Sequence, residues 1–247
     1  GAKPLAITNC LNFGNPENQE IMGEFAECLE GVKEACNFLN YPVVSGNVSF
    51  YNGTNKKNIY PTPVIGGVGL IKKLSKPLSH NFKQADSTII LIGKTFGHIE
   101  QSCYLKENYS ITDGMPPEIN LLNEKNNGEN LLKLIDKNLI LSAHDISNGG
   151  LITALSEMSL TSDFGAKIYK PKKLTNLFKY FFGEDQARYI IEIQTQKLPI
   201  VEKILKESNI YYENIGLTQE NYFEIEGELK ISTKDLFKIN NQWYSNY

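Results

Sequence analysis

The sequence of 247 residues lacks any apolar stretch close to the ~18 residues that a membrane-spanning helix requires. Its N-terminus has no basic segment followed by an apolar one, so the sequence predicts no signal peptide. Together these two absences predict a cytoplasmic protein that has no membrane partner.

Cysteine is scarce, and positive charge is not in excess. The four cysteines, Cys10, Cys28, Cys36 and Cys103, form no Cys-x-x-Cys pair and lie among apolar residues. This spacing argues against a disulfide framework or a zinc site and predicts reduced, buried thiols. Because 25 Lys and Arg residues stand against 28 Asp and Glu residues, the net charge is -3, which argues against a nucleic-acid partner.

Two common catalytic signatures are missing as well. Gly93-Lys94-Thr95 follow an apolar run as in a P-loop, but Thr88 stands where the first glycine of that motif belongs. Neither Ser45 nor Ser147 lies in the G-x-S-x-G sequence of an α/β-hydrolase. The sequence therefore predicts neither a P-loop nor a serine hydrolase.

The most informative stretch is VVSGNVSFYN, residues 43–52. Its valines predict a pleated, at least half-buried strand, and Gly46 allows the backbone to approach a ligand without a Cβ atom. The Asn47 carbonyl suits a hard cation such as Mg²⁺, Ser49 lies on the same strand face, and the amides near Gly46 suit phosphate. These features predict a binding strand, and the alternative is a bulged strand in the core.

The first 72 residues predict a mixed α/β order of strand, helix, strand, hairpin and strand at 4–13, 17–39, 43–52, 52–58 and 64–71. Because the chain begins almost inside a strand, we expect it to be a piece of a longer protein. Asn9, Asn12 and Asn15 surround the end of the first strand, where Gly14 allows close approach. Their carboxamides suit a nucleotide base or ribose, whereas Asn15 can equally form the turn before Pro16.

Pro77 and the weak hydrophobic periodicity around it predict a linker over residues 73–86 and a second domain over residues 87–247. In that domain strands and helices alternate, which is typical of an α/β sandwich. We expect strands at 88–92, 139–143, near 166, and at 187–193, 210–217 and 222–225. We expect helices at 99–107, 116–136 with an interruption at Gly128, 150–160, 173–182, 198–208 and from 233 onward.

Two polar segments of the second domain predict ligand contacts. In SAHDISNGGL, residues 142–151, a strand leads to His144 and Asp145, and a glycine-rich turn opens a helix. Asp145 suits a cation and the amides of residues 148–150 suit a phosphate; alternatively, Asp145 or Ser147 caps the helix and hydrogen bonds satisfy His144. In GEDQARY, residues 183–189, Glu184 and Gln186 suit a polar ligand, and Arg188 is expected to pair with a neighbouring acid.

The chain resembles the phosphoribosylformylglycinamidine synthase family in five segments whose order and spacing agree: ITNCLNFGNPE (7–17), VVSGNVSFYN (43–52), PTPVIGGVG (61–69), HDISNGGL (144–151) and GEDQARYIIE (183–192). This family belongs to the aminoimidazole ribonucleotide synthetase superfamily, and the resemblance extends over essentially the whole chain. Its members repeat a pair of α/β domains, and this sequence resembles the second copy, entered partway through its first domain.

The resemblance implies part of an ATP-dependent ligase of purine biosynthesis. Such enzymes convert formylglycinamide ribonucleotide, ATP and glutamine-derived ammonia to formylglycinamidine ribonucleotide, ADP and phosphate. Phosphorylation activates the formamide oxygen, ammonia then displaces phosphate, and Mg²⁺ offsets the charge of the triphosphate. The implied partners are the missing N-terminal half, a glutaminase subunit and a small accessory subunit.

The resemblance also implies roles for single residues. Gly46 matches an ATP-contacting glycine, Asn47 a magnesium ligand and Ser49 a substrate-contacting serine. The family's ATP-contacting acid falls on Asn9, which accepts a hydrogen bond but carries no charge. The family's catalytic histidine and base belong to the first copy, so no catalytic residue is assigned. A second, pseudo-symmetric nucleotide site is implied at His144, Asp145, Glu184 and Gln186.

The sequence leaves two functions open. The chain is either half of a purine-pathway ligase that is inactive without its other half, or a nucleotide-binding or assembly module that binds Mg-ADP without turnover. Addition of the N-terminal half distinguishes them, because only the first function gains turnover.

Overall fold

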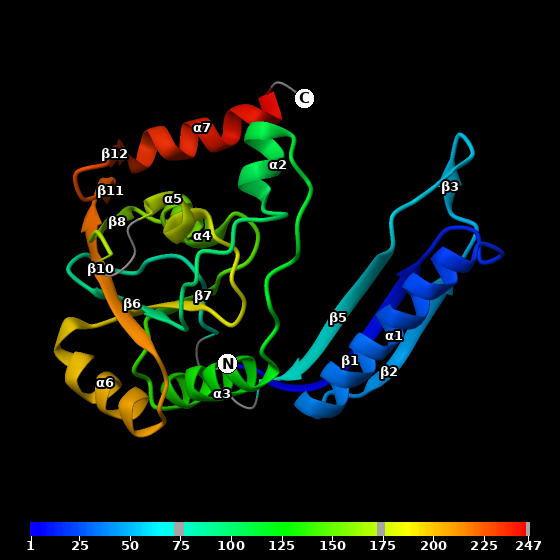
Figure 1. Ribbon diagram of the computed structural model, residues 1–247. Coiled ribbons are helices and arrows are strands. Elements are labelled where there is room, and N and C mark those ends of the chain that lie inside the picture. The colour runs from blue at the N-terminus through cyan, green and yellow to red at the C-terminus, as the bar shows by residue number, and fades with distance from the viewer. Residues whose placement is uncertain (72–76, 172–175, 246–247) are drawn as a thin grey trace. The chain divides into compact units, whose positions relative to one another are not determined.

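The computed structural model describes residues 1–71, 77–171 and 176–245. Contacts divide the chain into unit 1, from Gly1 to Lys76, and unit 2, from Pro77 to Tyr247 (Figure 1). The predicted mixture of helices and strands is confirmed in both units. Of the expected linker, residues 77–86 group with unit 2, and residues 73–76 lie outside the described part of the chain.

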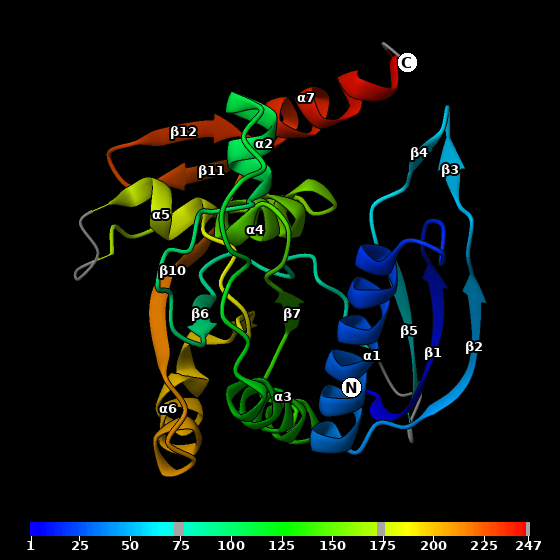
Figure 2. The same cartoon turned by 45° about the vertical axis from the view of Figure 1, so that its right-hand side comes forward.

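Unit 1 is a three-stranded sheet with one long helix beside it (Figure 2). Strand β1 (Lys3–Asn12) lies in the centre, parallel to β2 (Val43–Ser49) and antiparallel to β5 (Thr62–Leu70). Helix α1 (Gln19–Leu39) agrees closely with the predicted range because asparagine caps both of its ends. The Asn18 side chain accepts a hydrogen bond from Glu20 N, and Asn40 takes the left-handed conformation that ends the helix.

A short hairpin follows β2 and consists of β3 (Gly53–Thr54) and β4 (Lys57–Asn58). The two residues of its turn, Asn55 and Lys56, have φ angles of 52° and 65°. Positive φ at both central residues is the requirement of a type I′ turn, whose twist matches that of the flanking strands. The hairpin expected over residues 52–58 is therefore confirmed.

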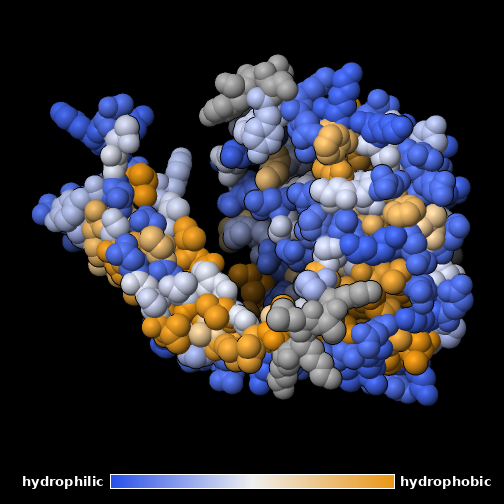
Figure 3. All heavy atoms as spheres, turned by 180° about the vertical axis from the view of Figure 1, so that it is seen from behind, coloured by the Kyte–Doolittle hydropathy of each residue, from blue (hydrophilic) through white to orange (hydrophobic). Residues whose placement is uncertain are grey.

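One face of the unit 1 sheet is covered and the other is open. Leu11, Phe13 and Ile21 form a small core between the sheet and α1. Val64 lies opposite Cys10 in the sheet, so it shares the face away from Leu11 and stays exposed. Hydrophobic residues accordingly gather on the surface of unit 1 (Figure 3).

The expectation that β2 is at least half buried is wrong for this chain. The strand lies at the edge of its sheet, so it is not a core strand, and Val44 is 67% exposed. Val43 and Val48 are exposed as well. The valines carry the sequence signature of a packed strand, but the described residues of unit 1 leave all three of them exposed.

Unit 2 is built around a mixed sheet of seven strands in the order β12-β11-β8-β10-β6-β9-β7 (Figure 1). These strands are β6 (Thr88–Ile92), β7 (Ser142–Asp145), β8 (Phe164–Ile168), β9 (Tyr189–Ile193), β10 (Tyr212–Glu220), β11 (Tyr222–Ile225) and β12 (Leu229–Ser232). Neighbouring strands are antiparallel except β11 and β8, which are parallel.

Helices cover both faces of this sheet. Ile89 and Leu91 of β6 point into the core formed with α4 (Gly150–Leu160) and α5 (Leu177–Phe182). The alternate residues Ile90 and Ile92 point into the core formed with α3 (Leu121–Asp136) and α6 (Leu198–Glu207). Also in unit 2 are α2 (Cys103–Tyr109), α7 (Thr233–Ser245) and the 3₁₀ turn η1 (Thr195–Lys197). Within the described ranges, none of the helices combines the length and apolar character needed to cross a bilayer.

Several predicted boundaries in unit 2 are wrong by a few residues. Helix α3 begins at Leu121 rather than at residue 116, because Asn120 forms its N-cap, and it continues through Gly128 without an interruption. Helix α2 begins at Cys103 because Ser102 caps it. Strand β7 covers 142–145 rather than 139–143, and residues 172–175, in the predicted helix over 173–182, lie outside the described residues.

One strand is missing from the sequence analysis, and one further expectation is wrong. Strand β12 is not indicated by the sequence, because it is a four-residue edge strand with an exposed lysine, Lys230. The four cysteines are partly exposed rather than buried, although all of them are free thiols as expected.

A buried carboxylate anchors the beginning of unit 2. Glu192 of β9 is fully buried, and it accepts hydrogen bonds from Lys83 N (2.9 Å), Gln84 N (3.3 Å) and Ser142 Oγ (2.8 Å). Burial raises the pKa of the Glu192 carboxyl above its ordinary value, and these hydrogen bonds oppose the shift.

Glu192→Gln should remove a pH dependence of stability. Because the pKa of Glu192 is raised on folding, the folded protein holds this proton more tightly than the unfolded chain does. The contribution of Glu192 to the free energy of unfolding therefore falls as the pH rises through its ordinary pKa and then its raised pKa. In urea unfolding between about pH 4 and about pH 7, the wild type should lose stability relative to the Gln variant. A difference that stays constant over this range would contradict the expectation.

Candidate functional site

Asn9 and Gly46, the two expected ATP contacts, are neighbours across the β1–β2 pair. They share the sheet face of Leu11, which is the face that carries α1. The Asn9 amide oxygen lies at the place where any other residue at position 46 would have its Cβ atom. Only glycine leaves room for this amide, so the two residues form one unit of the site.

Asn47 and Ser49 lie on the opposite, uncovered face of the same strand pair. Asn47 is exposed beside Cys10, and its Nδ2 lies 3.9 Å from Cys10 Sγ, which leaves the carbonyl oxygen available to a ligand. The Ser49 hydroxyl accepts a hydrogen bond from Asn52 Nδ2 at 3.1 Å. The four expected residues are thus adjacent in the sheet but divided between its two faces.

The donor set of this strand fits Mg²⁺ only together with phosphate oxygens. Asn47 offers one neutral oxygen, and the described residues contain no group of three or more His, Cys, Asp or Glu side chains placed to hold a metal. Proteins commonly bind Mg²⁺ through one or two ligands and leave the rest of its shell to phosphate oxygens and water. Asn47 is therefore compatible with a nucleotide-bound cation and not with a cation held by this chain alone.

Asn12 and Asn15 have partners within the chain. Asn12 Nδ2 donates to Thr62 O on β5 at 3.4 Å. Asn15 Oδ1 accepts a hydrogen bond from Glu17 N at 2.9 Å, which closes the turn before α1. Of the two roles expected for Asn15, the structure contains the turn.

In unit 2, the ends of β6 and β7 and the start of β9 meet at one edge of the sheet. Strand β9 is antiparallel to both neighbours, so Tyr189 lies opposite Ile92 on one side and opposite Asp145 on the other. The two polar segments that the sequence singles out are therefore close together, and the loop after β6 lies with them.

His144 is held between two acids. Its Nδ1 lies 3.2 Å from Asp145 Oδ1, and its Nε2 lies 3.0 Å from Glu157 Oε2. A neutral imidazole has a single N–H group, so both contacts are hydrogen bonds only when the ring is protonated. Of the alternative, the cap by Asp145 or Ser147 is wrong, because Gly149 is the N-cap of α4 and no side chain caps it there. Its other part is confirmed, because His144 has hydrogen-bond partners.

The Glu184 carboxylate accepts a hydrogen bond from one of the backbone amides that the sequence analysis assigns to a phosphate. Its Oε1 accepts hydrogen bonds from Gly149 N and Cys103 N, both at 2.8 Å, at the N-termini of α4 and α2. Gly150 N donates to Ser147 O at 3.1 Å. A phosphate at this turn would therefore have to displace the chain's own carboxylate.

Asp185 ties the loop after β6 to the loop before β9. Its buried carboxylate accepts hydrogen bonds from the backbone N–H groups of Phe96 (3.0 Å), Gly97 (2.9 Å) and His98 (3.1 Å). The sequence analysis misses this residue, because nothing in GEDQARY distinguishes an inward carboxylate from its solvated neighbours.

Arg188 binds oxygens of the same loops and is 1% exposed. It donates to Asp185 O (3.0 Å), Gly183 O (2.6 Å) and Thr95 Oγ1 (3.2 Å). The expected ion pair with an acid is therefore wrong, because the guanidinium is bonded to two carbonyls and a hydroxyl. Burial lowers the pKa of Arg188, and the nearby Asp185 opposes that shift.

Glu184→Ala should destabilise unit 2 by about 1–3 kcal/mol, because it leaves the amides of Gly149 and Cys103 without an acceptor. Gln186→Ala is the matched control, since Gln186 is exposed and its side chain has no hydrogen-bond partner among the described residues. The control should stay within about 0.5 kcal/mol of the wild type. Urea unfolding measures both, and equal stability of the two variants would contradict the role of Glu184.

Sequence comparison matches each unit to one family. Residues 1–71 match the N-terminal domain of the AIR synthase related proteins, and residues 84–226 match the C-terminal domain. Phosphoribosylformylglycinamidine synthase subunit PurL of Pelagibacter ubique is 53% identical over 247 residues, which are 100% of this chain and 34% of that protein. The chain thus spans about a third of the length of the curated relatives that it matches.

Two solved structures have a similar fold. The structure of T. maritima PurL complexed with ATP has a TM-score of 0.70 and 15% sequence identity, over 96% of this chain and 38% of that one. The structure of T. maritima PurL complexed with FGAR has a TM-score of 0.73 and 16% identity, over 96% and 40%. At such low identity the similarity concerns the fold.

Proposed function

The chain belongs to the AIR synthase related protein family, and we propose that it forms half of the catalytic part of an ATP-dependent, amidine-forming ligase of purine biosynthesis. This enzyme would convert formylglycinamide ribonucleotide, ATP and ammonia to formylglycinamidine ribonucleotide, ADP and phosphate. The proposal is supported by 53% identity to the PurL subunit of P. ubique over the whole chain. Because the chain corresponds to 34% of that protein, the proposal includes an N-terminal companion half.

The observation that supports this function best is the open β1–β2 surface. Asn47 stands on a sheet face that also exposes Val64 and Val68, and unit 1 covers neither valine. Burial of apolar surface stabilises a protein by about 25 cal/mol per Å², so such a face gains from a covering partner. We propose that the companion half covers this face and completes the nucleotide site.

The strand pair suggests how this half of the site acts. Because β2 is an edge strand, a ligand that lies along this edge can reach residues on both faces of the sheet. Asn9 and Gly46 would contact ATP from one face, while Asn47 would hold Mg²⁺ and Ser49 would contact the ribonucleotide from the other. Held there, Mg²⁺ supplies compensation for the negative charge of the triphosphate. The companion half would contribute the catalytic side chains.

The proposal also includes partners and a location. A glutaminase subunit would supply ammonia, a small accessory subunit would join the assembly, and the enzyme would act in the cytoplasm. In the unit 2 loops, His144, Asp145, Glu184 and Gln186 would form a second nucleotide site only if Glu184 releases Gly149 N.

Complementation tests the proposed function. We expect a mixture of this chain, the companion half, Mg-ATP, formylglycinamide ribonucleotide and ammonium chloride to release phosphate, and each half alone to release none. Ammonium chloride makes the assay independent of the glutaminase. Phosphate release that stays at the level of the single halves, although circular dichroism shows both halves to be folded, would contradict the proposal.

A second function is a nucleotide-binding module without turnover. Asn9 carries no charge where the family has an ATP-contacting acid, which weakens the ATP contact at this position. Calorimetry with Mg-ADP on this chain separates the two functions. Tight binding combined with no turnover on complementation would support the module.

A further inference from the structure

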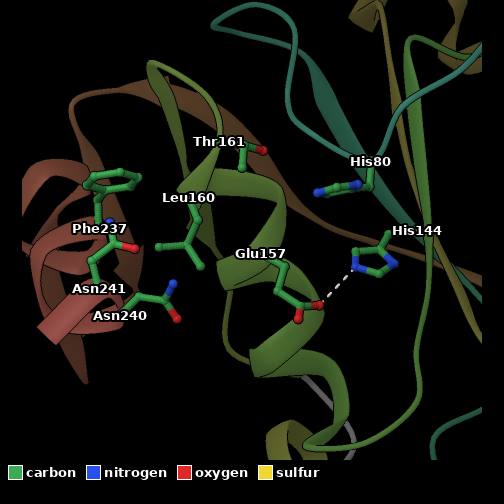
Figure 4. Close-up of a pocket in the computed structure, with 8 residues that line it drawn as sticks. All are labelled: His80, His144, Glu157, Leu160, Thr161, Phe237, Asn240 and Asn241. Carbon is green, nitrogen blue, oxygen red and sulfur yellow. Dashed lines mark hydrogen bonds and ion pairs between the residues drawn. The ribbon is translucent and has the colours of Figure 1, made fainter. Parts of the chain in front are cut away.

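A pocket of about 410 Å³ opens in unit 2 (Figure 4). It lies between α4, α7 and the end of β7, and its walls are His80, His144, Glu157, Leu160, Thr161, Phe237, Asn240 and Asn241. Small-molecule sites typically have volumes of roughly 300–1,000 Å³, apolar walls and a few polar groups. The pocket has these properties, and the proposed ligase reaction assigns no role to most of its residues.

One side of the pocket combines an aromatic ring with two carboxamides. Phe237, Asn240 and Asn241 all belong to α7, and Phe237 is 53% exposed. Within the described part of the chain, the side-chain oxygen and nitrogen atoms of Asn240 and Asn241 have no hydrogen-bond partner. These groups are therefore available to a ligand.

The other side of the pocket is rigid and acidic. The hydrogen bond from His144 Nε2 holds the Glu157 carboxylate, and the His80 ring packs 5.1 Å from the His144 ring. No lysine or arginine lines the pocket. A ligand that carries phosphate would meet the Glu157 carboxylate with only the imidazoles of His80 and His144 beside it, so the pocket favours an uncharged ligand.

We propose that this pocket binds an uncharged adenine nucleoside. The base stacks on Phe237, and a carboxamide of Asn240 or Asn241 donates to N7 and accepts from the N6 amino group. Aromatic stacking of a base and the two-point pairing of a carboxamide with adenine are both favourable contacts. This site is separate from the β1–β2 strand pair, and it shares only His144 with the second nucleotide site proposed above.

Titration of the chain with adenosine tests the site. We expect saturable binding by calorimetry or ligand-observed NMR, and Phe237→Ala should weaken it about tenfold through the loss of stacking. Phe178→Ala is the matched control, because Phe178 is also a surface aromatic residue of unit 2 and is 60% exposed. Phe237→Ala should keep the unfolding temperature of the wild type, since about half of that ring is in solvent, whereas Phe178→Ala also loses ring contacts with Tyr104 and Phe182.

Changes in the ligand test the recognition itself. 7-Deazaadenosine lacks the N7 acceptor and should bind about tenfold more weakly than adenosine, and the Asn240→Ala/Asn241→Ala variant should bind both equally. AMP should displace adenosine poorly. The proposal is overturned by the absence of saturable binding at about 5 mM adenosine. It is also overturned if Phe237→Ala weakens binding no more than Phe178→Ala, if 7-deazaadenosine binds as well as adenosine, or if AMP binds as tightly as adenosine.

Discussion

Arg188→Met should lower the free energy of unfolding of unit 2 by about 3–5 kcal/mol. The substitution removes the donors to Gly183 O, Asp185 O and Thr95 Oγ1 in a place that water does not reach. Buried acceptors without a donor lose their hydrogen bonds and gain no hydration in return. It also removes a positive charge near the buried Asp185 carboxylate, which then keeps only its hydrogen bonds from the backbone N–H groups of Phe96, Gly97 and His98.

Urea unfolding measures this loss, and hydrogen exchange locates it. The amides of Phe96, Gly97 and His98 should exchange faster in the Met variant, because the loop that carries their acceptor, Asp185, is no longer held by Arg188. Lys167→Met is the matched control, since it removes a cation that lies 3.9 Å from Glu224 at the surface. It should cost no more than about 1 kcal/mol. Similar losses of unfolding free energy in the two variants would show that the buried contacts of Arg188 stabilise unit 2 no more than a surface ion pair does.

The elements that the sequence predicts well are those specified by local signals. Helix α1 is an example, because apolar residues repeat with helical spacing and Asn18 and Asn40 supply its two caps. Strand β6 is another, since an unbroken apolar run is typical of a strand buried on both faces. Strand β12 lacks such signals, so it becomes a strand only by pairing with β11.

The candidate site is predicted as a set of residues and not as an arrangement. The position of Asn47 and Ser49 two residues apart predicts a shared face, and the structure agrees. The strand that pairs with β2 and the register of that pairing depend on the tertiary fold. The sequence near Asn9 and Gly46 therefore cannot predict that these two residues lie on the opposite sheet face from Asn47 and Ser49. The same limit applies to Asp185, whose inward direction is decided by amides that lie 87–89 residues away.

The wrong expectation for β2 is informative in itself. Val43, Val44 and Val48 have the composition of a packed strand, yet all three are exposed in this chain. Sequence patterns report the burial that a protein achieves in its complete form, and this chain spans about a third of its curated relatives. Val48 lies opposite Leu11 and shares with Val44 the face that carries α1, so their exposure follows from the edge position of β2 and not from the open face of Asn47.

Asn47→Leu should lower the ATP-dependent turnover of the complemented protein about 100-fold, which corresponds to about 2.7 kcal/mol of transition-state stabilisation. Leucine branches at Cγ as asparagine does but has no oxygen to offer a nucleotide-bound cation. Asn47 is exposed on its strand, so the substitution should leave the stability of unit 1 unchanged. The Mg²⁺ concentration needed for half-maximal rate should rise at the same time, because the lost group is the proposed ligand.

Two further variants separate a ligand from a merely adjacent side chain. Asn47→Asp keeps an oxygen at the same place, and it should retain turnover within about tenfold of the wild type and lower the Mg²⁺ requirement. Ser45→Ala changes an exposed residue two positions earlier on the same strand face, and its turnover should be unchanged. If Asn47→Leu behaves like Ser45→Ala, the strand does not hold the cation. A loss of turnover in Asn47→Leu with no change in the Mg²⁺ requirement would instead place Asn47 at the covered interface, because there its removal weakens the contact between the halves.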